Sequence, residues 1–360
     1  MSLKVLLVDA SQPPPPKKPT KKRRGWYYNL GLAKAERWWS ERGAEVCRAS
    51  SDVALFEVAG ATVAFVSAIF SWHVTSALAT ATMLRKRGVV VEVGGPGFFA
   101  LRELARASGF EAQVNPDARF DRTPGAYNAV FWSRGCPAYN CALGYPKDGS
   151  RPICLVPELE GSRHTLFSDV TPAPIILDNN LSALPRRHQE HIVERTLEAG
   201  FKHVDCNSGF EPASFKPDTA ALWKRLPLVA WRYAYDEIAE RERVLKVLGI
   251  LDGLGVSRRK SHIYCIAGNE PVAECERRAR EIRDWGCVPV VQRRRPLDWT
   301  GPPAPLPTLH DWTPRKLMDF QRWGNWLSHS IAFSAYDPSL NHSGVKVNPG
   351  RLRPLPMVAT

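Results

Sequence analysis

The stretch that decides the fold is residues 174–206, PIILDNNLSALPRRHQEHIVERTLEAGFKHVDC. It opens with a short β-rich run at 174–177 and closes with another at 203–206. Between the two runs, residues 186–199 carry a helical pattern. A strand, a helix and a second strand in this order are typical of an α/β protein with a parallel sheet.

The same alternation extends in both directions along most of the chain. The sequence predicts strands at 4–8, 62–67, 89–93, 129–132, 174–177, 203–206, 229–233, 262–266 and 288–292, and its clearest helices at 32–42, 186–199, 241–253 and 271–285. We therefore predict an α/β fold in three parts: an N-terminal Rossmann-like open sheet over 1–121, a second α/β domain over 122–298, and a tail over 299–360 with a proline-rich linker and a helix at 314–330. Because the second domain has about six strand and helix units, too few for a closed eightfold barrel, we expect a partial (β/α)6 barrel.

Composition restricts the class of protein and its partners. The 360 residues are 44% hydrophobic and carry a formal net charge of +13, which favours anionic partners. Eight cysteines are too few for a disulfide scaffold, so we expect a reducing cytoplasm. Residues 58–84 contain no Asp, Glu, Lys or Arg, but their polar residues and pattern favour a strand at 62–67 and a helix at 74–85 over a membrane span. No membrane partner is expected.

Three cysteines lie in one loop after the strand at 129–132. Cys136 and Cys141 follow this strand, and Cys154 comes after a gap of twelve further residues. Three thiolates would hold a [4Fe–4S] cluster with one iron left open to a substrate or cofactor. A zinc site with His164 as the fourth ligand is the alternative, and unligated structural thiols are a third interpretation. The other cysteines are expected to be buried, with Cys206 at a strand end the least clear case.

Several blocks of sequence resemble the radical S-adenosylmethionine (radical SAM) superfamily, in particular a group with a cobalamin-domain-like N-terminal part. The blocks are residues 134–136 (RGC), 154–161 (CLVPELEG), 176–181 (ILDNNL), 204–209 (VDCNSG), 231–236 (WRYAYD) and 320–325 (FQRWGN). They occur in the family's order and cover most of residues 128–336. The gaps between the cysteines, four and twelve residues, are longer than the family's usual three and two, so an insertion must loop out before Cys154.

The resemblance implies a radical SAM enzyme. Cys136, Cys141 and Cys154 would hold a [4Fe–4S] cluster, and SAM would chelate the open iron. An external electron donor would supply the electron that cleaves SAM to methionine and a 5′-deoxyadenosyl radical. The substrate is not identified; the net charge favours a nucleic acid or nucleotide.

Polar residues stand at the end of every predicted strand of the second domain. Because loops after parallel strands meet at one edge of a sheet, Asn179, Asn180, Asn207 and Asp236 are the predicted SAM contacts. The alternative for each residue is a helix cap or a turn. Residues 293–295, three arginines after the last strand, would either bind a phosphorylated substrate or form a solvated loop.

In the N-terminal part, Ser67 and the glycines of residues 94–97 fall where a cobalamin-type domain has its binding loops. Cobalamin is a possible cofactor, but the histidine motif that would ligate cobalt is missing after the first strand, where residues 11–16 stand instead. We therefore expect a degenerate structural or substrate-docking domain. The basic segment at 11–24 would either hold a phosphate backbone or keep the surface soluble.

A rival function belongs to another class: a non-catalytic nucleic-acid-binding protein that contains zinc or a cluster and retains the fold. The polar strand ends separate the two hypotheses, because a binding module has little need of them. The residues that would carry catalysis beyond the cofactors are not identified by the sequence.

Overall fold

The computed structural model describes residues 3–11, 29–51, 60–113, 120, 125, 127–136, 165–327 and 336. The chain divides into two compact units. The first comprises residues 1–173 and 296–306, and the second comprises residues 174–295 and 307–360. The predicted boundaries at 121 and 298 remain sequence-based expectations.

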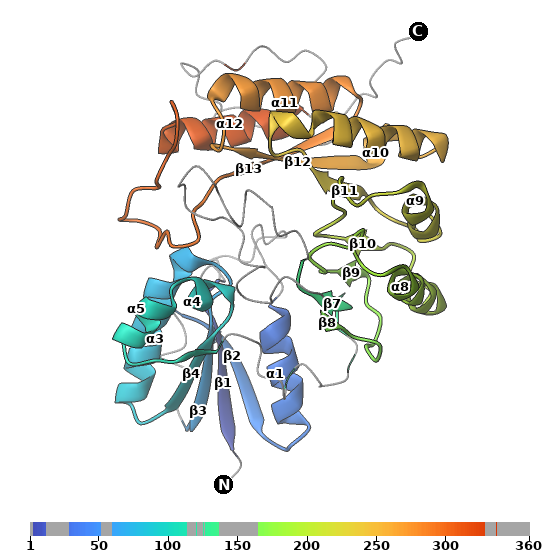
Figure 1. Ribbon diagram of the computed structural model, residues 1–360. Coiled ribbons are helices and arrows are strands. Elements are labelled where there is room, and N and C mark those ends of the chain that lie inside the picture. The colour runs from blue at the N-terminus through green and yellow to red at the C-terminus, as the bar shows by residue number, and fades with distance from the viewer. Residues whose placement is uncertain are drawn as a thin grey trace, which may run out of the picture. The chain divides into compact units, whose positions relative to one another are not determined.

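The first unit contains a five-stranded parallel sheet in the order β2-β1-β3-β4-β5 (Figure 1). Its strands are β1 (Lys4–Asp9), β2 (Glu45–Ser50), β3 (Val63–Ser67), β4 (Val90–Gly94) and β5 (Ala112–Gln113). This order is that of flavodoxin-like doubly wound sheets, in which ligands bind beyond the carboxyl ends of β1 and β3, where the strand order reverses. The predicted Rossmann-like open sheet is confirmed, and β2 and β5 were not expected from the sequence.

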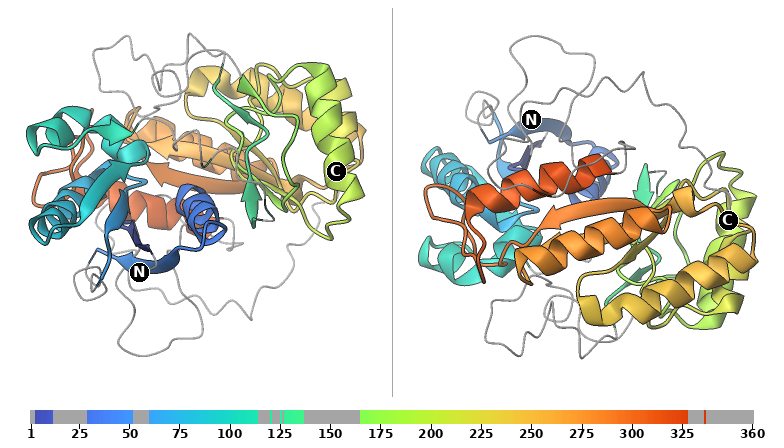
Figure 2. Two further views of the ribbon diagram at one scale, coloured as in Figure 1. Left: turned by 90° about the horizontal axis from the view of Figure 1, so that it is seen from below. Right: turned by 90° about the horizontal axis from the view of Figure 1, so that it is seen from above.

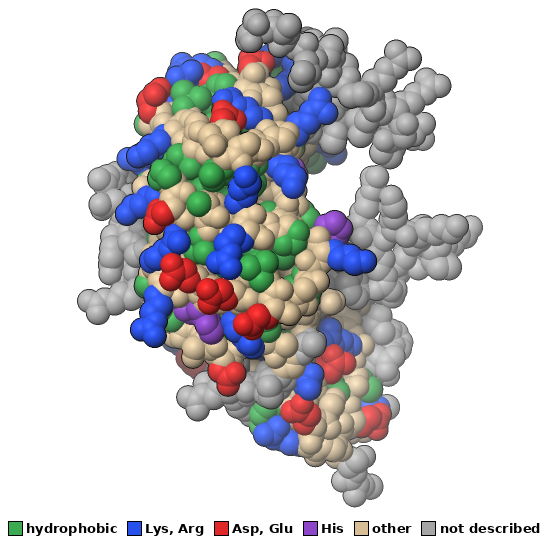
Figure 3. Space-filling view, turned by 90° about the vertical axis from the view of Figure 1, so that its right-hand side faces the viewer, with side chains coloured by type: hydrophobic (Ala, Val, Ile, Leu, Met, Phe, Trp, Pro, Cys, Tyr) green, Lys and Arg blue, Asp and Glu red, His purple; other side chains and the backbone are tan. Residues whose placement is uncertain are grey.

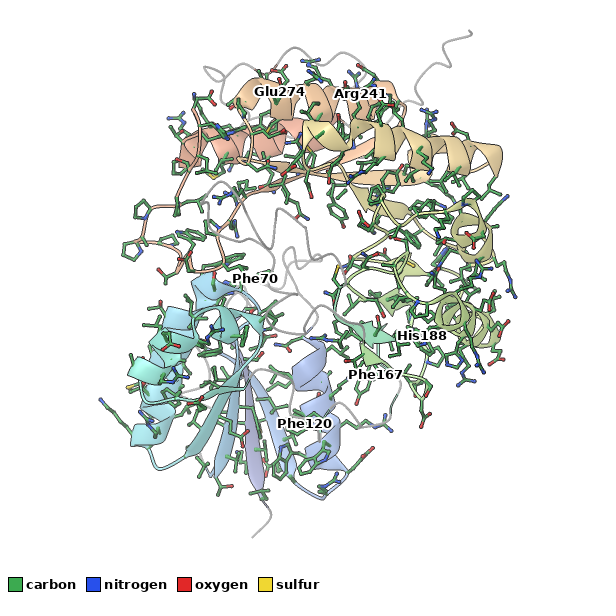
Figure 4. All side chains as sticks on the ribbon, viewed as in Figure 1. Phe70, Phe120, Phe167, His188, Arg241 and Glu274 are labelled. Atoms are coloured by element: carbon green, nitrogen blue, oxygen red, sulfur yellow. The ribbon has the colours of Figure 1, made fainter. Side chains whose placement is uncertain are left out.

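Helices pack on both faces of this sheet. α3 (Val74–Lys86) covers one face, where its small and aliphatic residues join a core with Leu6, Val66 and Phe98. α1 (Leu30–Ser40) lies on the other face, where Phe120 packs edge-on against Phe65 with ring centroids 5.4 Å apart (Figure 4). The short helices α4 (Pro96–Ala100) and α5 (Arg102–Ala107) follow β4. The strand β3 and helix α3 confirm our interpretation of residues 58–84.

The second unit is built from parallel strands that follow one another in sequence order. β9 (Ile175–Ile176) pairs with β10 (Asp205–Cys206), and β11 (Trp231–Ala234) pairs with β12 (Ser261–Ala267), which pairs with β13 (Val288–Arg293). Two isolated parallel bridges, between Val204 and Leu228 and between Phe210 and Tyr233, link β10 to β11. All strands therefore point the same way, as predicted, while closure into a partial barrel stays a prediction.

Helices cover one face of these strands (Figure 2). They are α8 (Arg186–Glu198), α9 (Pro217–Trp223), α10 (Arg241–Gly253), α11 (Val272–Asp284) and α12 (Pro314–Leu327). In β12, residues Ser261, Ile263, Cys265 and Ala267 are buried, whereas the residues between them are half-buried. Because side chains alternate along a strand, the second set faces away from the helices. Arg241 and Glu274 lie on the outer helices, as Figure 4 shows.

Three short strands lie near the predicted cysteine loop. They are β6 (Ala129–Val130), β7 (Ser133–Arg134) and β8 (Thr165–Leu166), and β7 pairs with β8 in antiparallel fashion. Gly135, directly after β7, has φ of 99°, a backbone conformation that favours glycine. It therefore allows the chain to turn just before Cys136.

α12 closes the open edge of the second sheet at β13. The side chain of Asn325 accepts a hydrogen bond from the Val291 amide (2.7 Å) and donates one to the Val291 carbonyl (3.2 Å), and Gln321 donates to the same carbonyl (3.1 Å). Gly324 lets the helix come this close, because a Cβ there would lie 2.3 Å from Cγ2 of Val291. Block 320–325 thus satisfies backbone groups that an edge strand leaves unpaired.

Candidate cofactor site at the strand ends

The predicted contact residues lie at the carboxyl ends of the parallel strands of the second unit. Asn179 and Asn180 follow β9, Asn207 follows β10, and Asp236 follows β11 with one residue between them. Since these strands are parallel, their carboxyl ends share one edge of the sheet. The four residues have different environments, and they divide into two groups.

Asn179 is the residue with an unused acceptor. Its side chain is half-buried, and its Oδ1 atom is buried without a hydrogen-bond partner among the residues that the structure places. A buried acceptor without a partner costs about 1–3 kcal/mol, so a ligand that donates a hydrogen bond there would be favoured. An ammonium group or a ribose hydroxyl would be such a donor.

Asn207 offers an exposed side chain on a fixed backbone. Its amide donates to the Ile176 carbonyl (2.9 Å), and its carbonyl accepts a hydrogen bond from the Tyr264 hydroxyl (3.4 Å). The position of the residue is therefore set by groups of β9 and β12, while its side-chain amide faces solvent. This arrangement suits a residue that contacts a ligand.

Asn180 and Asp236 are engaged within the protein. The Oδ1 atom of Asn180 accepts hydrogen bonds from the Ser182 hydroxyl and the Ala183 amide, both at 3.2 Å, as in a turn. The Asp236 carboxyl group is buried and accepts a hydrogen bond from the Ile266 amide (2.9 Å). For Asn180, the structure therefore shows the turn that was the alternative to ligand binding. The Asp236 carboxyl group instead joins the end of β11 to β12.

The electrostatic environment of Asp236 is unfavourable for its charged form. Burial, and next the charge of Glu240, raise the pKa of Asp236 to about 7, although Arg278 and the amide of Ile266 act in the opposite direction. Its own backbone amide donates to Glu240 (2.7 Å). The carboxyl group can therefore exchange a proton near neutral pH.

Arg278 of α11 ties the ends of β11 and β12 together. Its guanidinium group is completely buried and donates to Glu270 (2.9 Å), to the Tyr235 carbonyl (2.7 Å) and to the Ile266 carbonyl (2.9 Å). A buried guanidinium with this many acceptors fixes the backbone around it. Arg278 is not among the site residues that the sequence predicts. The one feature of the sequence that indicates its role is a charged residue on the buried face of an amphipathic helix.

A second polar network lies on the strand face that the helices leave uncovered. Arg232 forms a two-point ion pair with Asp205, with Nε to Oδ1 at 2.8 Å and Nη2 to Oδ2 at 2.9 Å. Its Nη1 donates to the Tyr264 hydroxyl (3.4 Å), which in turn donates to the carbonyl of Asn207. The network thus connects β10, β11 and β12 to one of the predicted contacts.

His262 shares this face, since the register places it opposite Arg232. Burial and the charge of Arg232 lower the pKa of His262, which favours the neutral form of its imidazole. Asp205, Arg232, His262 and Tyr264 are not among the site residues that the sequence predicts. The alternation of side chains along the strands could have placed them on one face, but the ion pair between distant strands had no signature in their spacing.

Only one of the three predicted cluster ligands belongs to the described part of the chain. Cys136 is half-buried and follows β7. Cys141, Cys154 and His164 lie outside the described residues, as does most of the basic segment at 11–24, so the cluster and zinc hypotheses remain open. Within the described ranges, no group of three His, Cys, Asp or Glu side chains gathers to hold a metal ion.

Cys206 packs in the core, as do three other cysteines. It is completely buried, and burial followed by the charge of Asp205 raises its pKa well above the usual value. It therefore stays a neutral thiol, which answers the question left open by its place at a strand end. Cys265, Cys275 and Cys287 are also buried, as expected, but Cys47 is only half-buried.

In the first unit, the expected cobalamin-binding loops pack against each other. A Cβ on Gly95 would lie 2.7 Å from the Ala68 carbonyl oxygen, and one on Gly97 would lie 2.5 Å from that of Phe70. Ser67 accepts a hydrogen bond from the side chain of Asn29 (3.0 Å). The glycines thus permit close contact within the chain, whereas we expected them to permit approach to a ligand.

On the face seen in Figure 3, Lys and Arg side chains are spread out with Asp and Glu among them. Among the side chains coloured there, the basic ones do not form a continuous stripe of the kind that nucleic-acid-binding surfaces usually carry. Among the described helices, none has the length and apolar character required to cross a bilayer.

The fold is similar to that of TsrM from Kitasatospora setae, a radical SAM methyltransferase solved with cobalamin and a [4Fe–4S] cluster bound. The match covers 81% of this chain and 75% of TsrM, with 14% sequence identity and a TM-score of 0.51. OxsB, a cobalamin-dependent SAM radical enzyme solved with aqua-cobalamin, matches over 79% of this chain and 52% of its own, with 13% identity and a TM-score of 0.44. No protein-family model and no curated protein matches the sequence.

The chain therefore has an α/β fold like that of TsrM, which agrees with the fold that the resemblance of its sequence blocks implied. At 14% identity this likeness concerns the fold, because function resides in the residues of a site rather than in the fold that carries it.

Proposed function

We propose that the protein is a radical SAM enzyme whose Cys136, Cys141 and Cys154 hold a [4Fe–4S] cluster. The observation that carries this proposal is the unused acceptor of Asn179, which stands at the carboxyl edge of a parallel sheet in a TsrM-like fold. A module that only binds nucleic acid has no need of a buried acceptor at this position.

The residues at the strand ends fit S-adenosylmethionine. Asn179 would accept a hydrogen bond from its amino group or ribose, and the exposed amide of Asn207 would donate to its carboxylate or to a hydroxyl. Asn180 would support these contacts by fixing the turn beside it, and Asp236 by joining the end of β11 to β12. When bound, the cluster would supply an electron from an external donor to cleave SAM into methionine and a 5′-deoxyadenosyl radical.

Two further features belong to the proposal. Thiolate ligands and the cluster require a reducing environment, so we place the enzyme in the cytoplasm. The net charge of +13 supports an anionic substrate such as a nucleotide or nucleic acid. Cobalamin is not included, because Ser67 and the glycine loop, which would line its site, are engaged with their own chain.

The decisive experiment is anaerobic reconstitution of the protein with iron and sulfide, followed by reduction in the presence of SAM. We expect charge-transfer absorption of a [4Fe–4S] cluster and release of 5′-deoxyadenosine. Cys136→Ala should abolish the cluster, whereas Cys206→Ala, which removes a buried thiol of raised pKa, should retain it. Stoichiometric zinc without this absorption would instead support the nucleic-acid-binding alternative.

A further inference from the structure

Arg293, the last residue of β13, carries a charged donor without an acceptor. Its side chain is half-buried, and its Nε atom is buried with no hydrogen-bond partner in the part of the chain that the structure describes. A buried donor of a charged group that lacks a partner is strongly unfavourable. One interpretation of residues 293–295 was a solvated loop. The half-buried side chain of Arg293 does not agree with it.

The charge of Arg322, which is also positive, acts on Arg293. Burial, and after it the charge of Arg322 on α12, lower the pKa of Arg293. α12 lies beside β13 in Figures 1 and 2, and its side chains contact the Val291 backbone two residues before Arg293. The two arginines therefore come from neighbouring elements of the same unit.

The two arginines of α12 form ion pairs with the same carboxylate. Asp319 has an exposed fraction of only 8% and is shared by Arg322, at 3.4 Å, and Arg315, at 3.7 Å. Arg293 forms no ion pair among the residues that the structure describes. Of these described charges, that of Arg293 and that of one of the two arginines sharing Asp319 therefore have no matching carboxylate.

We propose that Arg293 and Arg322 form a binding site for a phosphate group at the end of β13. Guanidinium groups bind phosphate through paired N–H donors in one plane, and the Nε of Arg293 would then gain its missing acceptor. A dianion matches the two unbalanced charges better than a carboxylate does. The phosphate could be inorganic or belong to a nucleotide, and the site does not depend on the proposed radical chemistry.

The stability of the protein in phosphate-free buffer tests this site. Because Arg293 is an unbalanced, half-buried cation, Arg293→Met should raise the midpoint of urea unfolding without phosphate. Phosphate at constant ionic strength should raise the midpoint of the wild type but not that of the variant. Arg195→Gln, which removes an exposed charge on α8 paired with Glu198, should leave the response to phosphate unchanged.

Calorimetry with defined anions identifies the ligand. Inorganic phosphate should bind the wild type, and Arg293→Met or Arg322→Gln should weaken binding about tenfold or more. Tighter binding of AMP than of phosphate would assign the site to a nucleotide, and equal affinities would assign it to phosphate itself. Acetate binding as tightly as phosphate would overturn the proposal, as would an unchanged phosphate response in both variants. If Arg293→Met does not fold, phosphate binding by the variant Arg322→Gln, at a more exposed position, decides whether the site exists.

Discussion

At the scale of single residues, the strand-end amides have distinct roles despite their similar chemistry. Asn179 has a buried acceptor that nothing in the described structure uses, whereas Asn180 uses the same atom to fix a turn. The sequence analysis grouped both as SAM contacts. Two adjacent residues of one type are equivalent in a sequence, and only their backbone conformations separate them.

Asn179→Ala should therefore weaken SAM binding without destabilising the protein. Loss of one hydrogen bond should raise the dissociation constant for SAM by about three- to tenfold, measured by calorimetry on the reconstituted protein. The free energy of unfolding should stay equal or rise slightly, because the unpaired acceptor is removed. Asn180→Ala is the matched control, and it should lower the free energy of unfolding by about 1 kcal/mol. Unchanged SAM affinity in Asn179→Ala would remove this residue from the site.

Asp236 should make stability depend on pH. Its pKa of about 7 in the folded protein exceeds its ordinary value of 3.8, so its contribution to stability is complete below pH 4 and is lost as pH rises through 7. The variant Asp236→Asn has no carboxyl group at this position, so it should not lose stability in this way as the pH rises. Relative to the variant, the wild type should lose about 2–3 kcal/mol between pH 5 and 7, measured by urea unfolding.

The control for this pH series is Asp218→Asn, a change at a side chain that is 62% exposed on α9. Parallel stability curves for the wild type and Asp236→Asn would contradict the prediction, because they would mean that the Asp236 carboxyl group titrates alike in the folded and unfolded chain.

At the scale of elements, the contact between α12 and β13 was the part least accessible to prediction. The sequence predicted a helix over 314–330 and assigned it to a tail, and the structure shows it fixed along the edge of the sheet. The FQRWGN block explains this position: Gln321 and Asn325 bind backbone groups of β13, and Gly324 provides room. Helical periodicity alone does not reveal which edge a helix will cover.

Gly324→Ala should destabilise the protein although alanine is the better helix former. The new methyl group would meet Val291, whose branched side chain cannot move aside, at a cost of about 1–3 kcal/mol. Adding Val291→Ala should make the double variant more stable than the sum of the two single effects predicts. Gly249→Ala on α10 meets nothing within 4 Å and should stabilise by up to about 1 kcal/mol. Equal effects of the two glycine substitutions in urea unfolding would refute the close contact.

At the scale of the whole molecule, the parallel architecture was well predicted. Each of the nine predicted strands coincides with a strand of the structure, because short β-rich runs between helices are a strong signal. Among the described strands, β2, β5, β7 and β8 were missed. β2 (Glu45–Ser50) contains two charged residues and has no fully buried position, so it lacks the apolar pattern of an inner strand.

The sequence by itself determined that this is an α/β protein with parallel strands, a strand and helix in place of a membrane span, and polar residues at successive strand ends. These features follow from local periodicity and composition, which act over a few neighbouring residues. The tertiary structure decided which residues meet: Asp205 with Arg232, Arg278 with the ends of β11 and β12, and Asn325 with Val291. Such pairs join positions 27 or more residues apart in most cases, and their energies depend on burial and geometry that no local pattern encodes.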